Sequence, residues 1–133
     1  MASTAKNLVK GNGRTILFVD DEKTLRDMVG TMLKVSGYRV LTAANGSEGL
    51  EVFRTRHKDI HAVILDWTMP GLTCCEVIQR LHQLKKSLPT IVISGHPQRL
   101  LQGQMNGNGQ TRFLQKPFGL DQLRETLGQV LEA

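Results

Sequence analysis

Short, almost purely apolar segments alternate along this chain with segments in which apolar residues recur every three or four positions. Uninterrupted runs rich in Val, Ile and Leu are typical of strands that are covered on both faces of a sheet. The recurring pattern is typical of amphipathic helices. We therefore predict five strands, each followed by a helix, with the strands over residues 15–20, 38–43, 60–66, 90–94 and 112–115.

The helical segments carry start and stop signals. The first predicted helix stops before Gly37, a residue that commonly ends helices. Asn45 and Thr73 each precede a glutamate by three residues, which is the spacing of a capping box. Leucines mark a last helix over residues 120–131. A helix over residues 97–110 is the weakest prediction, because three glycines interrupt its apolar pattern.

Strands that alternate with helices indicate the α/β class. Because the strands are apolar on both faces and helical crossovers are right-handed, we expect a doubly wound parallel sheet. Residues 1–14 are polar and end in Gly-Asn-Gly, so we interpret them as a flexible lead-in or linker before a domain over residues 15–133. In such sheets the ligand site lies at the carboxyl ends of the strands.

Chemically active side chains gather at these predicted strand ends. The first strand ends in Asp20 and Asp21, the third in Asp66 and the fourth in Ser94, while Lys116 follows the fifth. Three neighbouring carboxylates repel one another, and Mg²⁺ is the cation that suits such oxygen ligands. An aspartate beside Mg²⁺ is a nucleophile toward phosphorus, and an ammonium and a hydroxyl suit phosphoryl oxygens. Each residue alone is an ordinary cap or turn residue, but together they favour phosphoryl transfer.

Four segments resemble the response-regulator receiver family. These are residues 18–22 (FVDDE), 65–71 (LDWTMPG), 93–95 (ISG) and 113–118 (FLQKPF), and the last is most similar to receivers of hybrid histidine kinases. The resemblance implies a flavodoxin-like (βα)5 fold, a five-stranded parallel sheet of strand order 2-1-3-4-5. It also implies a phosphoacceptor domain of a two-component phosphorelay, which is a signalling switch and not an enzyme.

The resemblance assigns a role to each of the gathered residues. Asp66 is implied to be the phosphoacceptor, which takes the phosphoryl group from a histidine kinase or a histidine phosphotransfer protein. Asp20, Asp21, Asp66 and the backbone carbonyl of Thr68 are implied to hold Mg²⁺. Lys116 is implied to contact the phosphoryl oxygens, from a turn with a cis bond before the next residue.

Two further residues are implied to form the switch, namely Ser94 as the hydroxyl and Phe113 as the aromatic side chain. A homodimer through the face of the fourth helix, the fifth strand and the fifth helix is a further possibility that the family suggests. The chain departs from the family at Cys74, where glycine is frequent. Two further residues, Thr68 and His96, lie two positions beyond the phosphoacceptor and the switch serine. In the family, side chains at these positions influence the lifetime of the phosphoryl group, so the lifetime known for relatives does not apply to this chain.

Composition and charge bear on which partners and which cellular location we expect for the chain. The net charge of +5 owes much to three basic residues among the first fourteen, and aromatic residues are scarce, so we expect no direct binding of nucleic acid. No apolar run is long enough for a membrane span, so we expect no membrane contact by this domain. The adjacent Cys74 and Cys75 have no second cysteine elsewhere to pair with, which favours reduced thiols and a cytoplasmic location.

Two other functions compete with the receiver interpretation. A magnesium-dependent phosphatase of the haloacid-dehalogenase type needs a second acid two residues after its nucleophile, where this chain has Thr68. An interaction module that needs no phosphorylation is disfavoured because all the key positions are intact. The basic cluster over residues 54–58 is interpreted as the solvated end of a helix, with docking of an acidic partner as the alternative.

Overall fold

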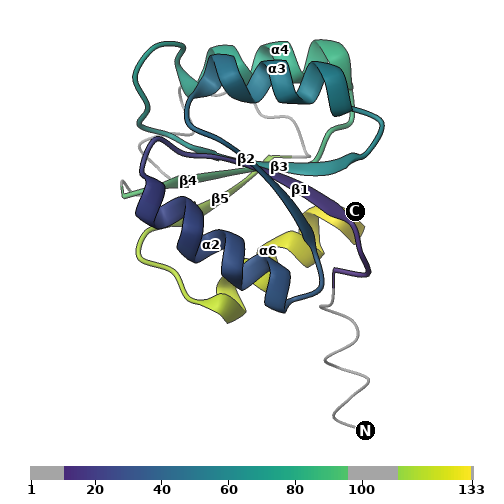
Figure 1. Cartoon of the computed structure of the whole chain (residues 1–133), viewed down its shortest axis with the longest axis vertical. Coiled ribbons are helices and arrows are strands. Elements are labelled where there is room, and N and C mark those ends of the chain that lie inside the picture. The colour runs from purple at the N-terminus through teal and green to yellow at the C-terminus, as the bar shows by residue number, and fades with distance from the viewer. Residues whose placement is uncertain (1–10, 96–110, 133) are drawn as a thin grey trace, which may run out of the picture.

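Parallel strands and helices alternate in the computed structural model of the chain (Figure 1). The structure describes residues 11–95 and 111–132. Its elements follow one another as β1 (Thr15–Val19), α2 (Lys23–Val35), β2 (Arg39–Ala43), α3 (Gly46–Arg56), β3 (Ile60–Asp66), α4 (Cys74–Leu84), β4 (Thr90–Ser94), β5 (Thr111–Gln115) and α6 (Leu120–Glu132).

The five strands form one sheet of order β2-β1-β3-β4-β5, with every neighbouring pair parallel. This confirms the predicted fold class and strand order. The predicted first strand is one residue too long, because β1 ends at Val19. Asp20 still lies against the sheet, since its N–H donates to the carbonyl of Ala43 over 3.1 Å. The helix predicted over residues 97–110 lies outside the described residues.

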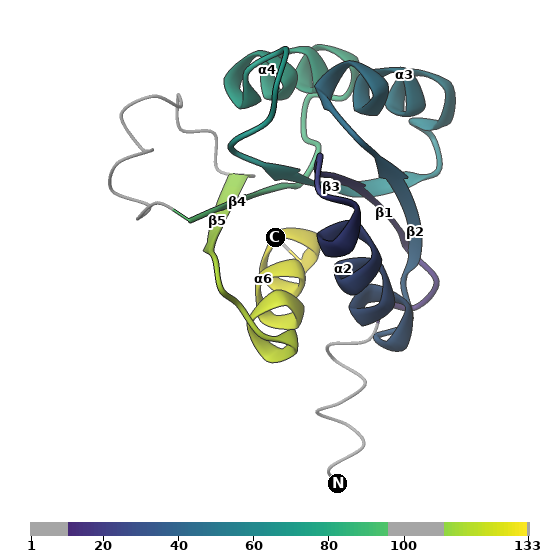
Figure 2. The same ribbon diagram turned by 60° about the vertical axis from the view of Figure 1, so that its left-hand side comes forward.

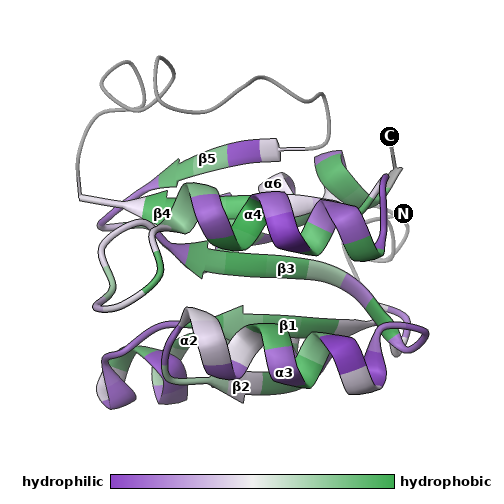
Figure 3. Cartoon of the chain, turned by 90° about the horizontal axis from the view of Figure 1, so that it is seen from above, coloured by the Kyte–Doolittle hydropathy of each residue, from purple (hydrophilic) through white to green (hydrophobic). Residues whose placement is uncertain are grey.

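Helices cover both faces of the sheet, α3 and α4 on one side and α2 and α6 on the other (Figures 1 and 2). The strand β1, which lies between β2 and β3, divides its side chains between the two cores. Leu17 and Val19 are buried against α3 and α4, whereas Ile16 and Phe18 are buried against α2 and α6. Each such burial contributes about 1.5–3 kcal/mol. In Figure 3 the strands β1 and β3 are mostly hydrophobic along their length, whereas hydrophobic and hydrophilic residues alternate along α3 and α4.

The predicted helix signals are present in the structure. Thr73 and Glu76 form both halves of a capping box at α4, with N–H to oxygen distances of 2.9 and 3.2 Å. Asn45 supplies one half at α3, where its side chain accepts from the Glu48 N–H over 2.9 Å. Gly37 follows α2 with a φ of 92°, a conformation that glycine adopts without strain.

The residues just before β1 contact the end of α2. The N–H of Gly11 donates to the carbonyl of Ser36 over 2.6 Å, and the N–H of Gly13 donates to that of Gly37 over 2.9 Å. Residues 1–10 lie outside the described residues, so the lead-in over residues 1–14 and its boundary stay a prediction. Within the described ranges, no helix has both the length and the apolar character that crossing a membrane requires.

Candidate functional site

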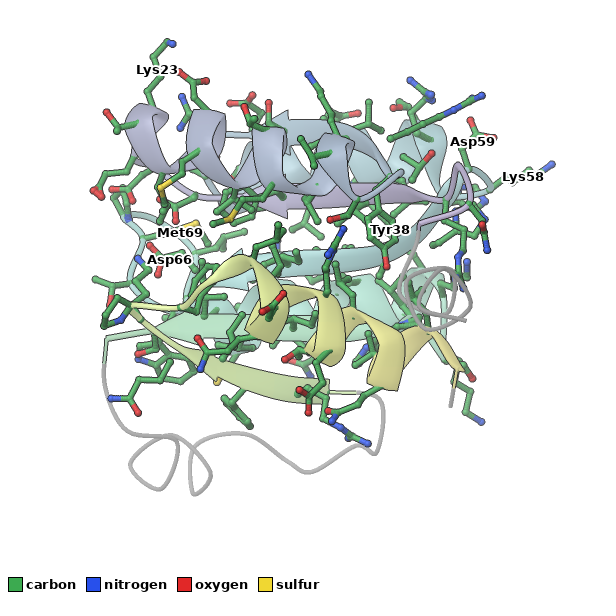
Figure 4. All side chains as sticks on the ribbon, turned by 90° about the horizontal axis from the view of Figure 1, so that it is seen from below. Lys23, Tyr38, Lys58, Asp59, Asp66 and Met69 are labelled. Atoms are coloured by element: carbon green, nitrogen blue, oxygen red, sulfur yellow. The ribbon has the colours of Figure 1, made fainter. Side chains whose placement is uncertain are left out.

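Three aspartates meet at the carboxyl edge of the sheet. Asp20 and Asp21 follow β1, and Asp66 ends the neighbouring strand β3. Each offers a carboxylate oxygen, and these oxygens all lie within 4.8 Å of one another. Figure 4 shows Asp66 at the end of the sheet opposite Lys58. The convergence predicted from the strand ends is therefore present for these three residues.

Asp20 is held rigidly beneath the surface. Its side chain is fully buried, and Oδ1 accepts from the N–H of Glu22 over 2.8 Å. Its backbone carbonyl accepts from Nη1 of Arg26, on the first turns of α2, over 2.6 Å. Oδ2 is also buried and has no hydrogen-bond donor among the described residues. A buried carboxylate oxygen without a donor is costly, and a cation bound at this atom would offset that cost.

Asp66 is held by the sheet on one side and by a turn on the other. The N–H of the following residue, Trp67, donates to the carbonyl of Ile93 on β4 over 2.8 Å. The N–H of Thr68 approaches Oδ1 of Asp66 at 3.4 Å, which is long for a hydrogen bond. The carboxylate of Asp66 is therefore positioned by its backbone more than by hydrogen bonds to its oxygens.

Lys116 brings a positive charge to the same place. Its ammonium lies 3.4 Å from Oδ1 of Asp66 and 3.9 Å from Oδ2 of Asp20. Its backbone N–H donates to the carbonyl of Ser94 over 2.7 Å, which ties the turn after β5 to the end of β4. The peptide bond before Pro117 is cis, as the resemblance implied.

Burial and crowding shape the charges of this site. Burial raises the pKa of Asp20 to about 6; the hydrogen bond from Glu22 opposes that rise, and the charge of Asp66 adds to it. Burial also raises the pKa of Asp66, against the opposing effect of the Lys116 ammonium. The single positive charge of Lys116 thus does not balance the negative charges of the three carboxylates. Their all-oxygen donor set fits a hard divalent cation such as Mg²⁺.

The two predicted switch residues lie on the adjoining strands. Ser94 is buried at the end of β4, directly after the residue that pairs with Asp66. Phe113, on β5, pairs with Val92 and is partly buried against the core beneath α3 and α4. Thr68 is exposed beside the site. His96 lies outside the described residues.

Sequence reasoning missed the contact of Arg26 and the packing around the cysteines. A hollow of about 410 Å³ beside the loop that follows Asp66 is lined by Trp67, Met69, both cysteines and two threonines. Cys74 is buried at the wall of this hollow, and its burial raises the pKa of the thiol to about 12. Neither cysteine forms a disulfide bond, in agreement with the prediction of reduced thiols.

The strand order and the acidic edge define a flavodoxin-like α/β domain with a group of three carboxylates at the carboxyl ends of its strands. The sequence profile of the response regulator receiver domain matches residues 16–128, and the chain belongs to this family. It is accordingly a phosphoacceptor domain of two-component signalling.

Relatives of several kinds share this domain. The chain is 33% identical over 123 residues to the phosphate regulon transcriptional regulatory protein PhoB of Pseudomonas aeruginosa, which covers 90% of the chain but only 52% of that protein. The receiver domain of the hybrid histidine kinase CckA is 30% identical with a TM-score of 0.76, covering 88% of this chain and 98% of that one. The response regulator TrrA of Thermotoga maritima, solved in complex with Mg²⁺-BeF, is 30% identical with a TM-score of 0.75, covering 89% and 99%.

Proposed function

We propose that Asp66 is the phosphoacceptor of this receiver domain. The observation that carries the proposal is the position of its Oδ1, which lies 3.4 Å from the Lys116 ammonium within the group of three carboxylates. In the proposed step, a carboxylate oxygen of Asp66 forms a bond to phosphorus while the bond from phosphorus to a histidine nitrogen breaks. The donor is a phosphohistidine on a histidine kinase or on a histidine phosphotransfer protein.

Asp20, Asp21, Asp66 and the backbone carbonyl of Thr68 are the proposed ligands of Mg²⁺. The buried Oδ2 of Asp20, which has no hydrogen-bond donor in the described part of the chain, supports this assignment. The Mg²⁺-BeF complex of the Thermotoga relative supports it as well. When bound, the ion neutralises the carboxylates and the charge that spreads over the phosphoryl oxygens.

The remaining residues act on the phosphoryl group from other sides. Lys116 holds its ammonium where a phosphoryl group on Asp66 would present oxygens, and it stabilises their charge. The Ser94 hydroxyl donates to another of these oxygens. Phe113 then turns toward the core that it already touches, so that phosphorylation biases the domain between two conformations.

The setting of the domain is also part of the proposal. Residues 15–133 form the receiver, residues 1–14 form a linker, and the domain works in the cytoplasm without contacting membrane or nucleic acid itself. The chain spans about half the length of the Pseudomonas regulator that it matches. A homodimer would use β5, α6 and residues 97–110, of which the last lie outside the described residues.

Phosphorylation by acetyl phosphate with MgCl₂ tests the proposal. We expect the intact mass of the full chain to rise by one phosphoryl group, and we expect Asp66→Asn or excess EDTA to abolish the gain. Asp59→Asn is the matched control, because Asp59 is an exposed aspartate at the opposite end of the sheet. Equal labelling of Asp66→Asn and the wild-type chain would overturn the assignment.

A further inference from the structure

A second charged hollow lies at the amino edge of the sheet, far from the phosphoacceptor. It has a volume of about 390 Å³, and the side chains that matter for its chemistry are Arg39, Arg56, Lys58, Asp59 and His61. We call it the basic hollow. Figure 4 shows Lys58 and Asp59 at one end of the molecule and Asp66 at the other. The hollow and the phosphoryl site therefore occupy opposite edges of the same sheet.

The parallel register of the sheet builds this hollow. Thr15, the first residue of β1, pairs with Arg39 on β2 and with Ile60 on β3. Arg56 ends α3, and Lys58 and Asp59 lie in the turn that leads into β3. Two separate stretches, β2 and the segment that leads from the end of α3 into β3, thus bring their cationic side chains to one edge.

The hollow carries an excess of positive charge. Arg39, Arg56 and Lys58 face a single acid, Asp59, whose carboxylate lies 3.2 Å from Nε of Arg56. The side chains of this pair are 50% and 62% exposed, so the pair contributes only about 0–1 kcal/mol. Because that contact is weak, the Arg56 guanidinium is available to a second carboxylate at little cost.

His61 adds a hydrogen-bond donor to the same hollow. The N–H of Thr15 donates to Nδ1 of His61 over 3.0 Å. A ring nitrogen that accepts a hydrogen bond carries no proton, so the proton of the neutral ring is on Nε2. His61 is exposed, and it therefore presents an N–H rather than a lone pair to a ligand. Apart from Asp59, the titratable side chains of the hollow suit an anionic partner.

We propose that the basic hollow docks an acidic segment, rich in aspartate and glutamate, of another protein. Guanidinium groups bind carboxylates with two parallel hydrogen bonds, which suits Arg39 and Arg56 to this partner. Among the described residues, no Phe, Tyr or Trp side chain lines the hollow, and these are the side chains on which single-stranded nucleic acid stacks most often. A second copy of this chain is also a poor occupant, because it carries 17 basic against 12 acidic residues.

The position of the hollow adds a functional consequence. Because it lies at the edge opposite Asp66, an acidic segment bound there leaves the phosphoacceptor accessible. Docking at a second point raises the effective concentration of a partner that must also reach Asp66. This consequence rests on the proposed role of Asp66, but the docking itself does not.

Binding of a fluorescein-labelled decaglutamate peptide, followed by fluorescence anisotropy at low salt, tests the docking. We expect Arg39→Gln/Lys58→Gln to weaken binding about tenfold, since two of the three cations are lost. Lys23→Gln/Arg80→Gln is the matched control, because it removes the same net charge from exposed positions outside the hollow, and we expect less than about a twofold change. Asp59→Asn should tighten binding about two- to threefold, because it frees Arg56 from its competing carboxylate.

Three results would overturn the proposal. They are no binding of the peptide by the wild-type chain, equal weakening in the two double variants, and tighter binding of an oligo-dT strand or of pyrophosphate than of the peptide. Asp66→Asn should bind the peptide as the wild type does. The docking test thus gives its answer even if Asp66 proves not to be the phosphoacceptor.

Discussion

The ammonium of Lys116 lies 3.4 Å from Oδ1 of Asp66, across a site whose other side chains are carboxylates. In this position the lysine partly neutralises the site before any metal binds. It also occupies space that a phosphoryl oxygen would approach. The Lys116 side chain therefore weakens the binding of a cation to the carboxylates, but it stabilises a phosphoryl group on Asp66.

Lys116→Met separates these effects. We expect Mg²⁺ to bind about three- to tenfold more tightly, because a competing positive charge is gone. We expect labelling by acetyl phosphate to slow about a hundredfold, because the phosphoryl oxygens lose an ionic contact. Fluorescence of Trp67, the sole tryptophan and the neighbour of Asp66, reports the Mg²⁺ titration, and intact mass reports the labelling. The exposed Lys86→Met is the control, and weaker Mg²⁺ binding in Lys116→Met would contradict the competition.

Asp20→Asn should stabilise the protein at pH 7 when divalent ions are removed. Burial raises the pKa of Asp20 from 3.8 to about 6, so the folded state binds this proton more tightly than the unfolded state. The resulting stability is fully present below about pH 4 and is lost as the pH rises through about 6. Urea unfolding in EDTA should therefore show a gain of about 2–3 kcal/mol for Asp20→Asn at pH 7 and almost none at pH 4.

Asp27→Asn is the control of opposite sign for this measurement. The hydrogen bond from Lys23 lowers the pKa of Asp27, so its contribution is present at neutral pH and is lost as the pH falls through the folded-state value. The asparagine variant should lose stability at pH 7 and change little under more acidic conditions. An equal gain for Asp20→Asn at pH 4 and pH 7 would show that its effect does not come from ionisation.

Arg26→Gln should weaken Mg²⁺ binding without touching a carboxylate. Nη1 of Arg26 donates to the backbone carbonyl of Asp20, so the guanidinium holds the turn that presents Asp20 and Asp21. Losing this charged hydrogen bond should cost about 1–2 kcal/mol of unfolding free energy and about three- to tenfold in Mg²⁺ affinity. Arg26→Lys should recover part of the unfolding free energy and part of the Mg²⁺ affinity. Arg80→Gln, at an exposed position of α4, should change neither quantity. Unchanged Mg²⁺ affinity in Arg26→Gln would mean that the turn holds its position without this contact.

The two cysteines should differ in their reaction with iodoacetamide. Burial raises the pKa of Cys74 to about 12 and also closes off its thiol, whereas Cys75 is only partly buried. Since the thiolate is the reactive form, Cys75 should be alkylated first in the native protein. Cys74 should react only in urea. Peptide mapping by mass spectrometry resolves the two, and early alkylation of Cys74 would show that α4 opens readily at its first turn.

The architecture was predictable because the two signals that define it are local. Strands covered on both faces are apolar at nearly every position, as in β1 after Thr15, and a cap such as Thr73 needs only a glutamate three residues later. The convergence of Asp20, Asp21 and Asp66 followed from one rule on the edges of parallel sheets. Strand limits were off by a residue because hydrogen bonding, and not apolarity, decides where a strand ends.

Other features of the site depend on contacts between residues that only folding brings together, and no local sequence pattern indicates them. The bond from Arg26 to a backbone carbonyl leaves no trace in sequence, because any long donor at that helical position has the same pattern. The roles of Ser94 and Phe113 stay predictions, since they concern a phosphorylated state. The basic hollow combines residues from β2, α3 and β3, and the sequence alone indicated only its part around Arg56.

The alternation of β1 has a consequence for insertions and deletions. Because Ile16 and Phe18 enter one core while Leu17 and Val19 enter the other, removing one residue from this strand would exchange the two sets. The same slip would turn Asp20 away from its neighbours. Metal binding and folding would thus fail in a single step. The length of β1 is therefore fixed by both cores and by the site, so this strand should accept substitutions more readily than insertions or deletions.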